Sequence, residues 1–221
     1  MAFSLGAQDH VYRSTLFDEQ TWLRHGFGTA LSNDWPGEVT ATLKQTHSDH
    51  VHLVEAACAS GGELGEGDAL VTNAPRTAIS IRTADCVPIL LADPVHKAVA
   101  AIHAGWKGTA KAIVRRAVER MQAEFGSRPQ DLIAAIGPAI GECCYEVSAD
   151  VAAQFPMVEL PAHGKPHLNL PAINRRQLED AGVVAVDVLQ ACTKCDAGLL
   201  HSFRRDGDRS GRMHAVIGIL A

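Results

Sequence analysis

The sequence predicts an α+β fold in which mixed β-sheets carry helices on their outer faces. Three observations support this prediction. Strand-like runs outnumber helix-like runs, several of them follow one another with no helix between, and one later stretch has clear helical periodicity. Consecutive strands with helices between only some of them favour mixed sheets over a doubly wound parallel sheet.

The predicted strands are short runs that are rich in β-branched residues or alternate in polarity, and Gly, Pro, Asn or Asp bounds most of them. They are Val39–Lys44, Val51–Glu55, Ala69–Thr72, Thr77–Arg82, Val87–Ala92, Ala98–His103, Leu132–Ile136, Val183–Val188 and His214–Ile219.

The clearest predicted helix is Thr109–Phe125, where apolar residues recur at i, i+3, i+4 and i+7. Its polar face carries two pairs at i,i+4 spacing, and Gly126 follows as a C-terminal cap. The two pairs are Arg115–Glu119 and Arg120–Glu124.

A second helix is predicted over Pro171–Asp180, with Asn169 as its cap and Gly182 after its end, and a helical turn near Ala149–Gln154. The glycine-rich and proline-rich segments Gly61–Gly67 and Pro161–His167 are predicted to be surface loops.

Length and composition indicate one globular domain over residues 1–221, with 47% hydrophobic and 20% charged residues. A net charge of -5 gives no basic surface for nucleic acid or anionic lipid. The N-terminal residues show no signal-peptide pattern, and no apolar run is long enough to span a membrane. We therefore expect a cytoplasmic monomer or small homo-oligomer that acts on a small molecule, without nucleic-acid or membrane partners.

Three residues of metal-ligand type lie at the edges of predicted strands: His47 in KQTHSDHV, Cys86 in TADCVPILL and His103 in AIHAGWKGT. Catalytic zinc commonly takes three nitrogen or sulfur ligands and keeps a fourth position open. Each residue taken alone is more often a packed core or surface residue than a ligand. His50 or His52 could replace His47 as a ligand, although surface positions suit these two better.

Polar residues near this trio suggest an anion site. Gly105-Trp106-Lys107-Gly108-Thr109 joins a strand to the clearest helix, so its backbone N–H groups and Lys107 could bind phosphate, or the glycines could simply form a tight turn. Asp85 would anchor its loop or orient a ligand, with Asp68 in a similar role. Arg204 and Arg205, placed at a strand end, could bind phosphate or form surface ion pairs.

The remaining cysteines are more ambiguous. Cys192-x-x-Cys195 resembles half of a zinc knuckle, and Cys143-Cys144 would complete four thiols. Because adjacent side chains on an extended chain point apart, we do not expect a closed four-cysteine site.

Taken together, the motifs KQTHSDHV, GDALVT, TADCVPILLADP, AIHAGWKGTAKAIV, IGPAIGECCYEV and FRRDGDRSGR resemble the YfiH-type family of laccase-like proteins, from about Gly26 onward. The resemblance implies mixed sheets with outer helices and a metal site at His47, Cys86 and His103. It also implies phosphorolysis of adenosine, inosine and methylthioadenosine together with adenosine deamination, with Zn2+ as the metal and Cu2+ as the alternative.

Two other activities remain open at this point. Cys86 activated by a histidine would make a cysteine hydrolase, such as an amidase editing peptidoglycan precursors. A copper-dependent polyphenol oxidase (laccase) is the third choice, because it needs several coppers and many histidine ligands.

The resemblance has one departure. The family carries an arginine implicated in activity after its H-G-F motif, whereas HGFGTALSNDW has Ala30 at that position. We therefore expect substrate contacts in this region to differ from those of the family.

Overall fold

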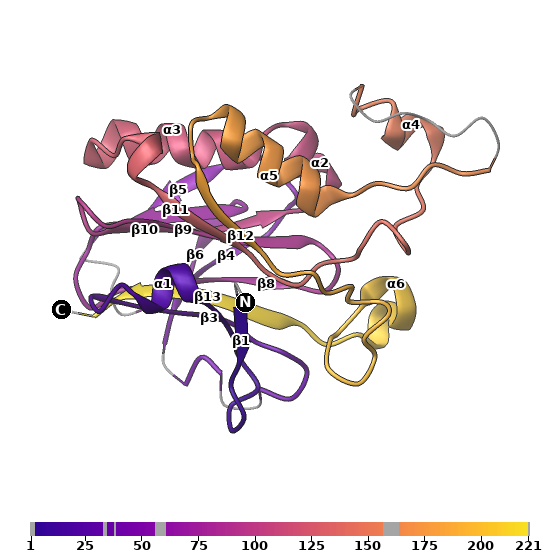
Figure 1. Cartoon of the computed structure of the whole chain (residues 1–221), viewed down its shortest axis with the longest axis horizontal. Coiled ribbons are helices and arrows are strands. Elements are labelled where there is room, and N and C mark those ends of the chain that lie inside the picture. The colour runs from indigo at the N-terminus through magenta and orange to yellow at the C-terminus, as the bar shows by residue number, and fades with distance from the viewer. Residues whose placement is uncertain (1–2, 33–34, 38, 56–60, 157–163, 221) are drawn as a thin grey trace.

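The central strands are buried along their whole length. Every residue of β9 (Val87–Asp93) and β10 (Ala98–Ala104) is buried, as expected for apolar runs that have packing partners on both faces. The computed structural model describes residues 3–32, 35–37, 39–55, 61–156 and 164–220. These strands form the middle of a three-layered molecule (Figure 1).

The strands form two mixed sheets. The larger has the order β1-β2-β3-β13-β8-β4-β6, and the smaller has the order β12-β11-β9-β10-β7-β5. The strands not yet defined are β1 (Phe3–Leu5), β2 (Tyr12–Ser14), β3 (Leu23–Phe27), β4 (Ala41–Lys44), β5 (Val51–Leu53), β6 (Gly62–Glu66), β7 (Ala69–Thr72), β8 (Ala78–Thr83), β11 (Ile133–Ile136), β12 (Ala185–Val188) and β13 (Met213–Ile219).

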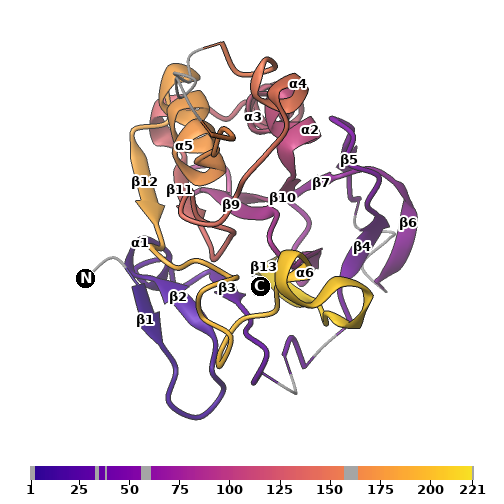
Figure 2. The ribbon, with the colours of Figure 1, turned by 90° about the vertical axis from the view of Figure 1, so that its right-hand side faces the viewer.

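Two helices cover the outer face of the smaller sheet, α3 (Ile113–Phe125) and α5 (Leu170–Asp180) (Figures 1 and 2). The shorter helical segments are α1 (Thr15–Asp18), α2 (Trp106–Ala110), η2 (Pro129–Asp131), α4 (Ala149–Ala152), α6 (Phe203–Asp206) and η3 (Gly207–Arg209). The apolar stripe of α3 is buried against the sheet, which accounts for the helical periodicity in its sequence.

The smaller sheet separates two apolar cores, because successive side chains on a strand point to opposite faces. Ile89 and Leu91 on β9 pack in the core beneath the helices, whereas Leu90 and Ala92 pack in the core shared with the larger sheet. The predicted α+β fold, with mixed sheets and outer helices in one compact domain, is thereby confirmed.

All the predicted strands are present, with ends displaced by a residue or two. The strands β1, β2, β3 and β6 were not predicted. Gly61–Gly67, expected to be a loop, mostly forms β6 at the edge of the larger sheet, where its pairing with β4 is irregular. The other expected loop, Pro161–His167, lies partly outside the described residues, which exclude 161–163.

The first predicted helix is interrupted near its start. Ala112 adopts a left-handed conformation with φ of 55°, so α2 ends at Ala110 and α3 begins at Ile113. Gly126 caps α3 in the left-handed region with φ of 73°, and the Asn169 side chain caps α5, both as predicted. The predicted turn near Ala149–Gln154 is α4.

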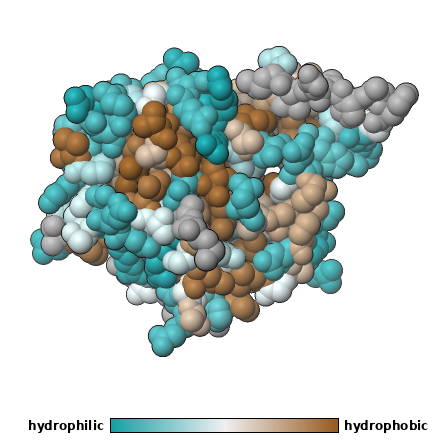
Figure 3. Space-filling view, in the orientation of Figure 1, coloured by the Kyte–Doolittle hydropathy of each residue, from teal (hydrophilic) through white to brown (hydrophobic). Residues whose placement is uncertain are grey.

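The face of the molecule seen in Figure 3 is hydrophilic around its edge, with apolar residues exposed over its middle, where β12 lies. Val184, just before β12, is 76% exposed. Among the described residues no helix has the length and apolar character needed to cross a membrane.

Candidate metal centre

His47 lies in the loop between β4 and β5, which a buried carboxylate holds in shape. Asp68, fully buried before β7, accepts hydrogen bonds from the backbone N–H groups of Thr46, His47 and Ser48 at 2.6–3.2 Å. The Ser48 hydroxyl donates to it as well, at 2.6 Å. These bonds fix His47 in a left-handed conformation with φ of 58°.

Cys86 and His103 come from neighbouring strands. Cys86 directly precedes β9, and His103 is near the end of β10, which pairs with β9 so that His103 lies opposite Pro88. The antiparallel hairpin therefore brings the thiol and the imidazole together. His103 Nδ1 lies 2.8 Å from Asp68 Oδ1, so its Nε2 is left for a ligand.

The three side chains converge as one group, whose potential ligand atoms all lie within 4.8 Å of one another. Cys86 Sγ is 3.9 Å from His47 Nε2, and the two imidazole rings are 5.0 Å apart at an interplanar angle of 76°. Tetrahedral zinc separates a sulfur ligand from a nitrogen ligand by about 3.6 Å. The donor set and its spacing thus fit a single ion of this kind.

Electrostatics favour the ligand form of the thiol. Burial alone would raise the pKa of Cys86, but hydrogen bonds from His103 and His47 outweigh it and lower this pKa to about 6. Burial would lower the pKa of His103, yet Asp68 and the Cys86 thiolate raise it to about 9. Without a metal, these shifts favour the thiolate of Cys86 and the imidazolium of His103, beside the Asp68 carboxylate.

Gly105 is needed for close packing at the centre. A Cβ atom there would lie 2.8 Å from His47 Cδ2 and 3.0 Å from Cys86 Sγ. A side chain at this position would therefore displace at least one of the three convergent residues.

The rest of the predicted anion segment separates into exposed and buried parts. Lys107 is exposed, with its amine 5.7 Å from the Trp106 ring. Gly108 is buried, and the Thr109 hydroxyl is buried against α5, where it accepts a hydrogen bond from Asn174 Nδ2 at 2.9 Å. Lys107 is thus the part of this segment that is available to an anion.

Asp85 is a structural link rather than a free carboxylate. Its two oxygens accept hydrogen bonds of 2.6 Å from the Thr193 hydroxyl and from the backbone N–H of Arg204. This carboxylate ties the Cys86 loop to two C-terminal segments.

Arg204 and Arg205 lie in helix α6, capped by Ser202, and not at a strand end as predicted. The prediction was wrong because the polar cap and turn begin a helix where an extended chain was expected. The Arg204 guanidinium is exposed and stacks 5.2 Å from the Tyr145 ring. Arg205 instead donates to the backbone carbonyls of Thr193 and Leu200 and pairs with Asp206.

A pocket of about 310 Å³ adjoins the centre and is lined by Trp106, Tyr145 and Arg204 among others. Trp106 follows Gly105, and Arg204 bonds to Asp85 beside Cys86. Burial, with the charge of Cys86, raises the pKa of Tyr145 to about 12, so its phenol keeps its proton. The volume lies at the lower end of the range for small-molecule sites.

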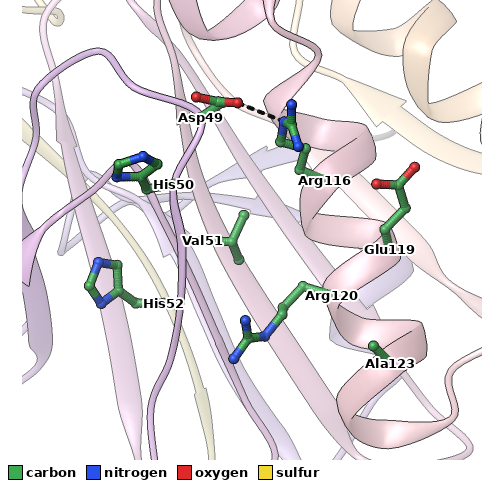
Figure 4. Close-up of a pocket in the computed structure, with 8 residues that line it drawn as sticks. All are labelled: Asp49, His50, Val51, His52, Arg116, Glu119, Arg120 and Ala123. Atoms are coloured by element: carbon green, nitrogen blue, oxygen red, sulfur yellow. Dashed lines mark ion pairs between the residues drawn. The ribbon is translucent and has the colours of Figure 1, made fainter.

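A larger, open depression of about 710 Å³ lies between β5 and α3 (Figure 4). It is lined by His50 and His52, beside an ion pair of 2.7 Å between Asp49 and Arg116. His52 Nε2 lies 2.6 Å from the carbonyl oxygen of Glu66. Neither histidine belongs to the group of His47, Cys86 and His103. This agrees with the surface positions that the sequence favoured for them.

Four cysteines that were not expected to cluster lie close together in the structure. The Sγ atoms of Cys143, Cys144, Cys192 and Cys195 lie within 4.8 Å of one another. The expectation failed because it assumed an extended chain at Cys143 and Cys144, whereas these residues lie in a tight turn.

Comparisons with known proteins agree with the fold and the motifs. The family model described as multi-copper polyphenol oxidoreductase laccase matches residues 28–220. The crystal structure of the Bacillus licheniformis hypothetical protein YfiH superposes with a TM-score of 0.88 at 29% identity, covering 98% of each chain.

Two curated relatives carry names of enzymes. One is the purine nucleoside phosphorylase of Deinococcus radiodurans, 45% identical over 77% of this chain and 68% of its own. The other is the adenosine deaminase RL5 of an unknown prokaryotic organism, 37% identical over 76% of this chain and 71% of its own. The chain belongs to this YfiH-like, laccase-type family, whose relatives include enzymes named for purine nucleoside chemistry.

Proposed function

We propose that the protein is a zinc-dependent purine nucleoside phosphorylase acting on adenosine, inosine and methylthioadenosine, with adenosine deaminase activity. The observation that carries the proposal is the convergence of His47, Cys86 and His103 beside the pocket lined by Tyr145 and Arg204. The names of the relatives support the substrate class.

When bound, zinc at this trio would supply a Lewis acid and an open coordination position. Asp68 would hold His103 in the tautomer that presents Nε2, and its bonds to the loop would hold His47. One cysteine with two histidines also suits copper, so the resident metal is part of the proposal.

Binding of the substrate would use the adjoining pocket. The Arg204 guanidinium, held over Tyr145 and by the carbonyl of Glu146, offers further N–H donors to a phosphate oxygen. Lys107 provides a second positive charge near Trp106. In phosphorolysis a phosphate oxygen bonds to C1′ of the ribose while the bond from C1′ to the base nitrogen breaks, and the protonated Tyr145 phenol could donate a hydrogen bond to the departing base.

The decisive experiment combines metal analysis of protein purified without oxygen with a product assay. Each of the three nucleosides is incubated with and without phosphate, and free base, ribose 1-phosphate and ammonia are measured. We expect release of base that requires phosphate, and release of ammonia from adenosine. No free base above the blank would remove the phosphorylase proposal.

A cysteine hydrolase is the second candidate, because Cys86, His103 and Asp68 form a chain of a thiol, an imidazole and a carboxylate. Activity that survives removal of the metal but is lost on alkylation of Cys86 would favour this candidate. Oxygen uptake that depends on copper, and that a Cys86→Ala variant lacks, would instead favour the polyphenol oxidase (laccase).

A further inference from the structure

The four clustered cysteines come from two loops that the smaller sheet places side by side. β11 and β12 are parallel neighbours, with Ile136 opposite Val188 at their carboxyl ends. The loop after β11 carries Cys143 and Cys144, and the loop after β12 carries Cys192 and Cys195. An isolated parallel bridge between Ala139 and Cys192 continues the pairing of these loops beyond the strands.

Tight turns direct the sulfurs of each loop toward the other loop. The backbone N–H groups of Cys144 and Tyr145 both donate to the carbonyl of Gly141, at 2.9 and 3.0 Å. The N–H groups of Cys195 and Asp196 donate in the same way to the carbonyl of Cys192. In a helical turn, residues three apart project to the same side and adjacent residues lie about 100° apart around the axis, whereas neighbours on a strand point to opposite faces.

The sulfur positions fit one tetrahedral ion. Cys195 Sγ lies 3.4 Å from Cys144 Sγ and 3.7 Å from Cys143 Sγ, and all four sulfurs lie within 4.8 Å of one another. Four zinc–sulfur bonds of about 2.3 Å place tetrahedral sulfurs about 3.8 Å apart. A disulfide requires about 2.05 Å between sulfurs, which neither of these two pairs approaches.

The surroundings of the cluster resemble the outer shell of a thiolate site. The Gly141 backbone N–H donates to Cys192 Sγ at 3.2 Å, which favours a sulfur that carries negative charge. Arg205 donates to the carbonyls of Thr193 and Lys194 and so holds the Cys192–Cys195 turn from outside. Gly141 packs closely against the cluster, because a Cβ atom there would lie 3.3 Å from both Cys143 Sγ and Cys192 Cβ, a tight contact.

We propose that Cys143, Cys144, Cys192 and Cys195 bind a structural Zn2+ ion, separate from the centre at His47, Cys86 and His103. Four protein thiolates fill a tetrahedral ion, so this site has no open position for substrate. A multi-iron cluster would hold its cysteine sulfurs farther apart, because several iron and sulfide ions would lie between them.

The ion has a mechanical role. It joins the loop after β11 to the loop after β12, and it fixes Thr193 between Cys192 and Cys195 in contact with Asp85. Asp85 in turn holds the backbone of Arg204 and precedes Cys86. The thiolate site thereby orders the pocket beside the other centre without taking part in the reaction.

The test substitutes Co2+ in the whole chain and compares the wild type, Cys195→Ser and Cys86→Ala. Thiolate-to-cobalt absorption increases with the number of coordinating sulfurs, so the two sites differ in intensity. We expect Cys86→Ala to keep the intense four-sulfur spectrum and one tightly bound ion, whereas Cys195→Ser loses most of that intensity. Retention of the full spectrum by Cys195→Ser would overturn the proposal.

A measurement on unaltered protein covers the case in which Cys195→Ser does not fold. Zinc-loaded and chelator-treated wild type are exposed to a thiol reagent, and labelled cysteines are located by mass spectrometry. The exposed Cys143 and Cys195 should be protected with zinc and react at least tenfold faster after its removal. Equal rates, or a disulfide among the four cysteines in the isolated protein, would contradict the structural ion. Neither readout depends on nucleoside activity.

Discussion

The Thr193 hydroxyl donates a hydrogen bond of 2.6 Å to the buried carboxylate of Asp85, which lies far away in the sequence. This bond joins the loop of Cys86 to the turn of Cys192 and Cys195. The main-chain carbonyl of Asp85 also accepts a bond of 2.9 Å from Ile140 N–H. One residue thus connects the candidate metal centre with the cluster of four thiols.

Replacing Thr193 by valine should destabilise the protein by about 1–3 kcal/mol, because a buried carboxylate oxygen loses its donor. Thr193→Ser, which keeps the hydroxyl, should lose much less. Urea denaturation of both variants gives the comparison. Equal stability of Thr193→Val and wild type would mean that the bond contributes nothing net to the folded state.

Asp68→Asn should weaken metal binding at His47, Cys86 and His103 by about 10–100-fold, the usual effect of removing a partner that orients a ligand. The carboxylate has a pKa well below its usual range: burial opposes ionisation, but bonds from His103 and Ser48 outweigh it. The measurement is zinc affinity against a competing chelator.

Asp93→Asn is the matched control for this variant. Asp93 is also fully buried, and its Oδ2 lies 2.8 Å from His96 Nδ1, but neither residue belongs to the trio. This variant should lower stability and leave zinc affinity unchanged. A similar loss of zinc affinity in both variants would point to general destabilisation.

Gly105→Ala should lower zinc affinity at least tenfold, because the added Cβ would lie 2.8 Å from His47 Cδ2 and 3.0 Å from Cys86 Sγ. Gly198→Ala is the control, since a Cβ there would meet nothing within 4 Å. Calorimetric titration with zinc compares the two. The prediction is wrong if both variants bind zinc as the wild type does.

The sequence predicted the strands of the smaller sheet well, because Val87–Ala92 and Ala98–His103 are long apolar runs that must be buried. It missed β3, where Arg24, His25 and Gly26 interrupt the pattern. His25 is nevertheless buried, since its ring packs edge-on against Phe17 and accepts a bond from Ser14. Such tertiary partners are not visible in local sequence.

The candidate site was predictable to a different extent at each residue. Motif resemblance selected His47, Cys86 and His103, which the structure brings together. The sequence only partly predicted that Asp68 holds the His47 loop in place. Its carboxylate accepts four hydrogen bonds from that loop, and these depend on the loop folding back over Asp68. The cluster of four thiols was not predicted, because it depends on two turns and on the parallel pairing of β11 with β12.

Arg204→Lys should raise the KM for phosphate about tenfold or more and change kcat less, because lysine loses the planar donors and the stacking on Tyr145. Ala30→Arg tests the departure from the family pattern separately. Ala30 N–H donates to the Leu199 carbonyl, in the loop that precedes α6. Phosphate saturation curves at fixed inosine measure both variants, and an unchanged KM in Arg204→Lys would remove this arginine from phosphate binding.

His25 should make the protein less stable in mild acid. Burial, with the positive charge of Arg13, lowers the pKa of His25 from 6.5 to about 4, although the exposed Asp18 carboxylate is 4.0 Å away. The unfolded chain therefore takes up a proton below pH 6.5 that the folded chain does not. The stabilisation is complete above pH 6.5 and is lost as the pH falls to about 4, by up to about 3 kcal/mol.

His25→Gln separates this effect from the titration of carboxylates. Glutamine can still accept the bond that Ser14 N–H donates to His25 Nε2 at 2.9 Å, but it does not titrate. The free energy of unfolding of both proteins is measured by urea denaturation between pH 4 and 8. The difference between wild type and variant should shift in favour of the variant as the pH falls below 6.5, because only the wild type gains a proton on unfolding. Parallel curves over this range would show that His25 is protonated equally in the folded and unfolded chains.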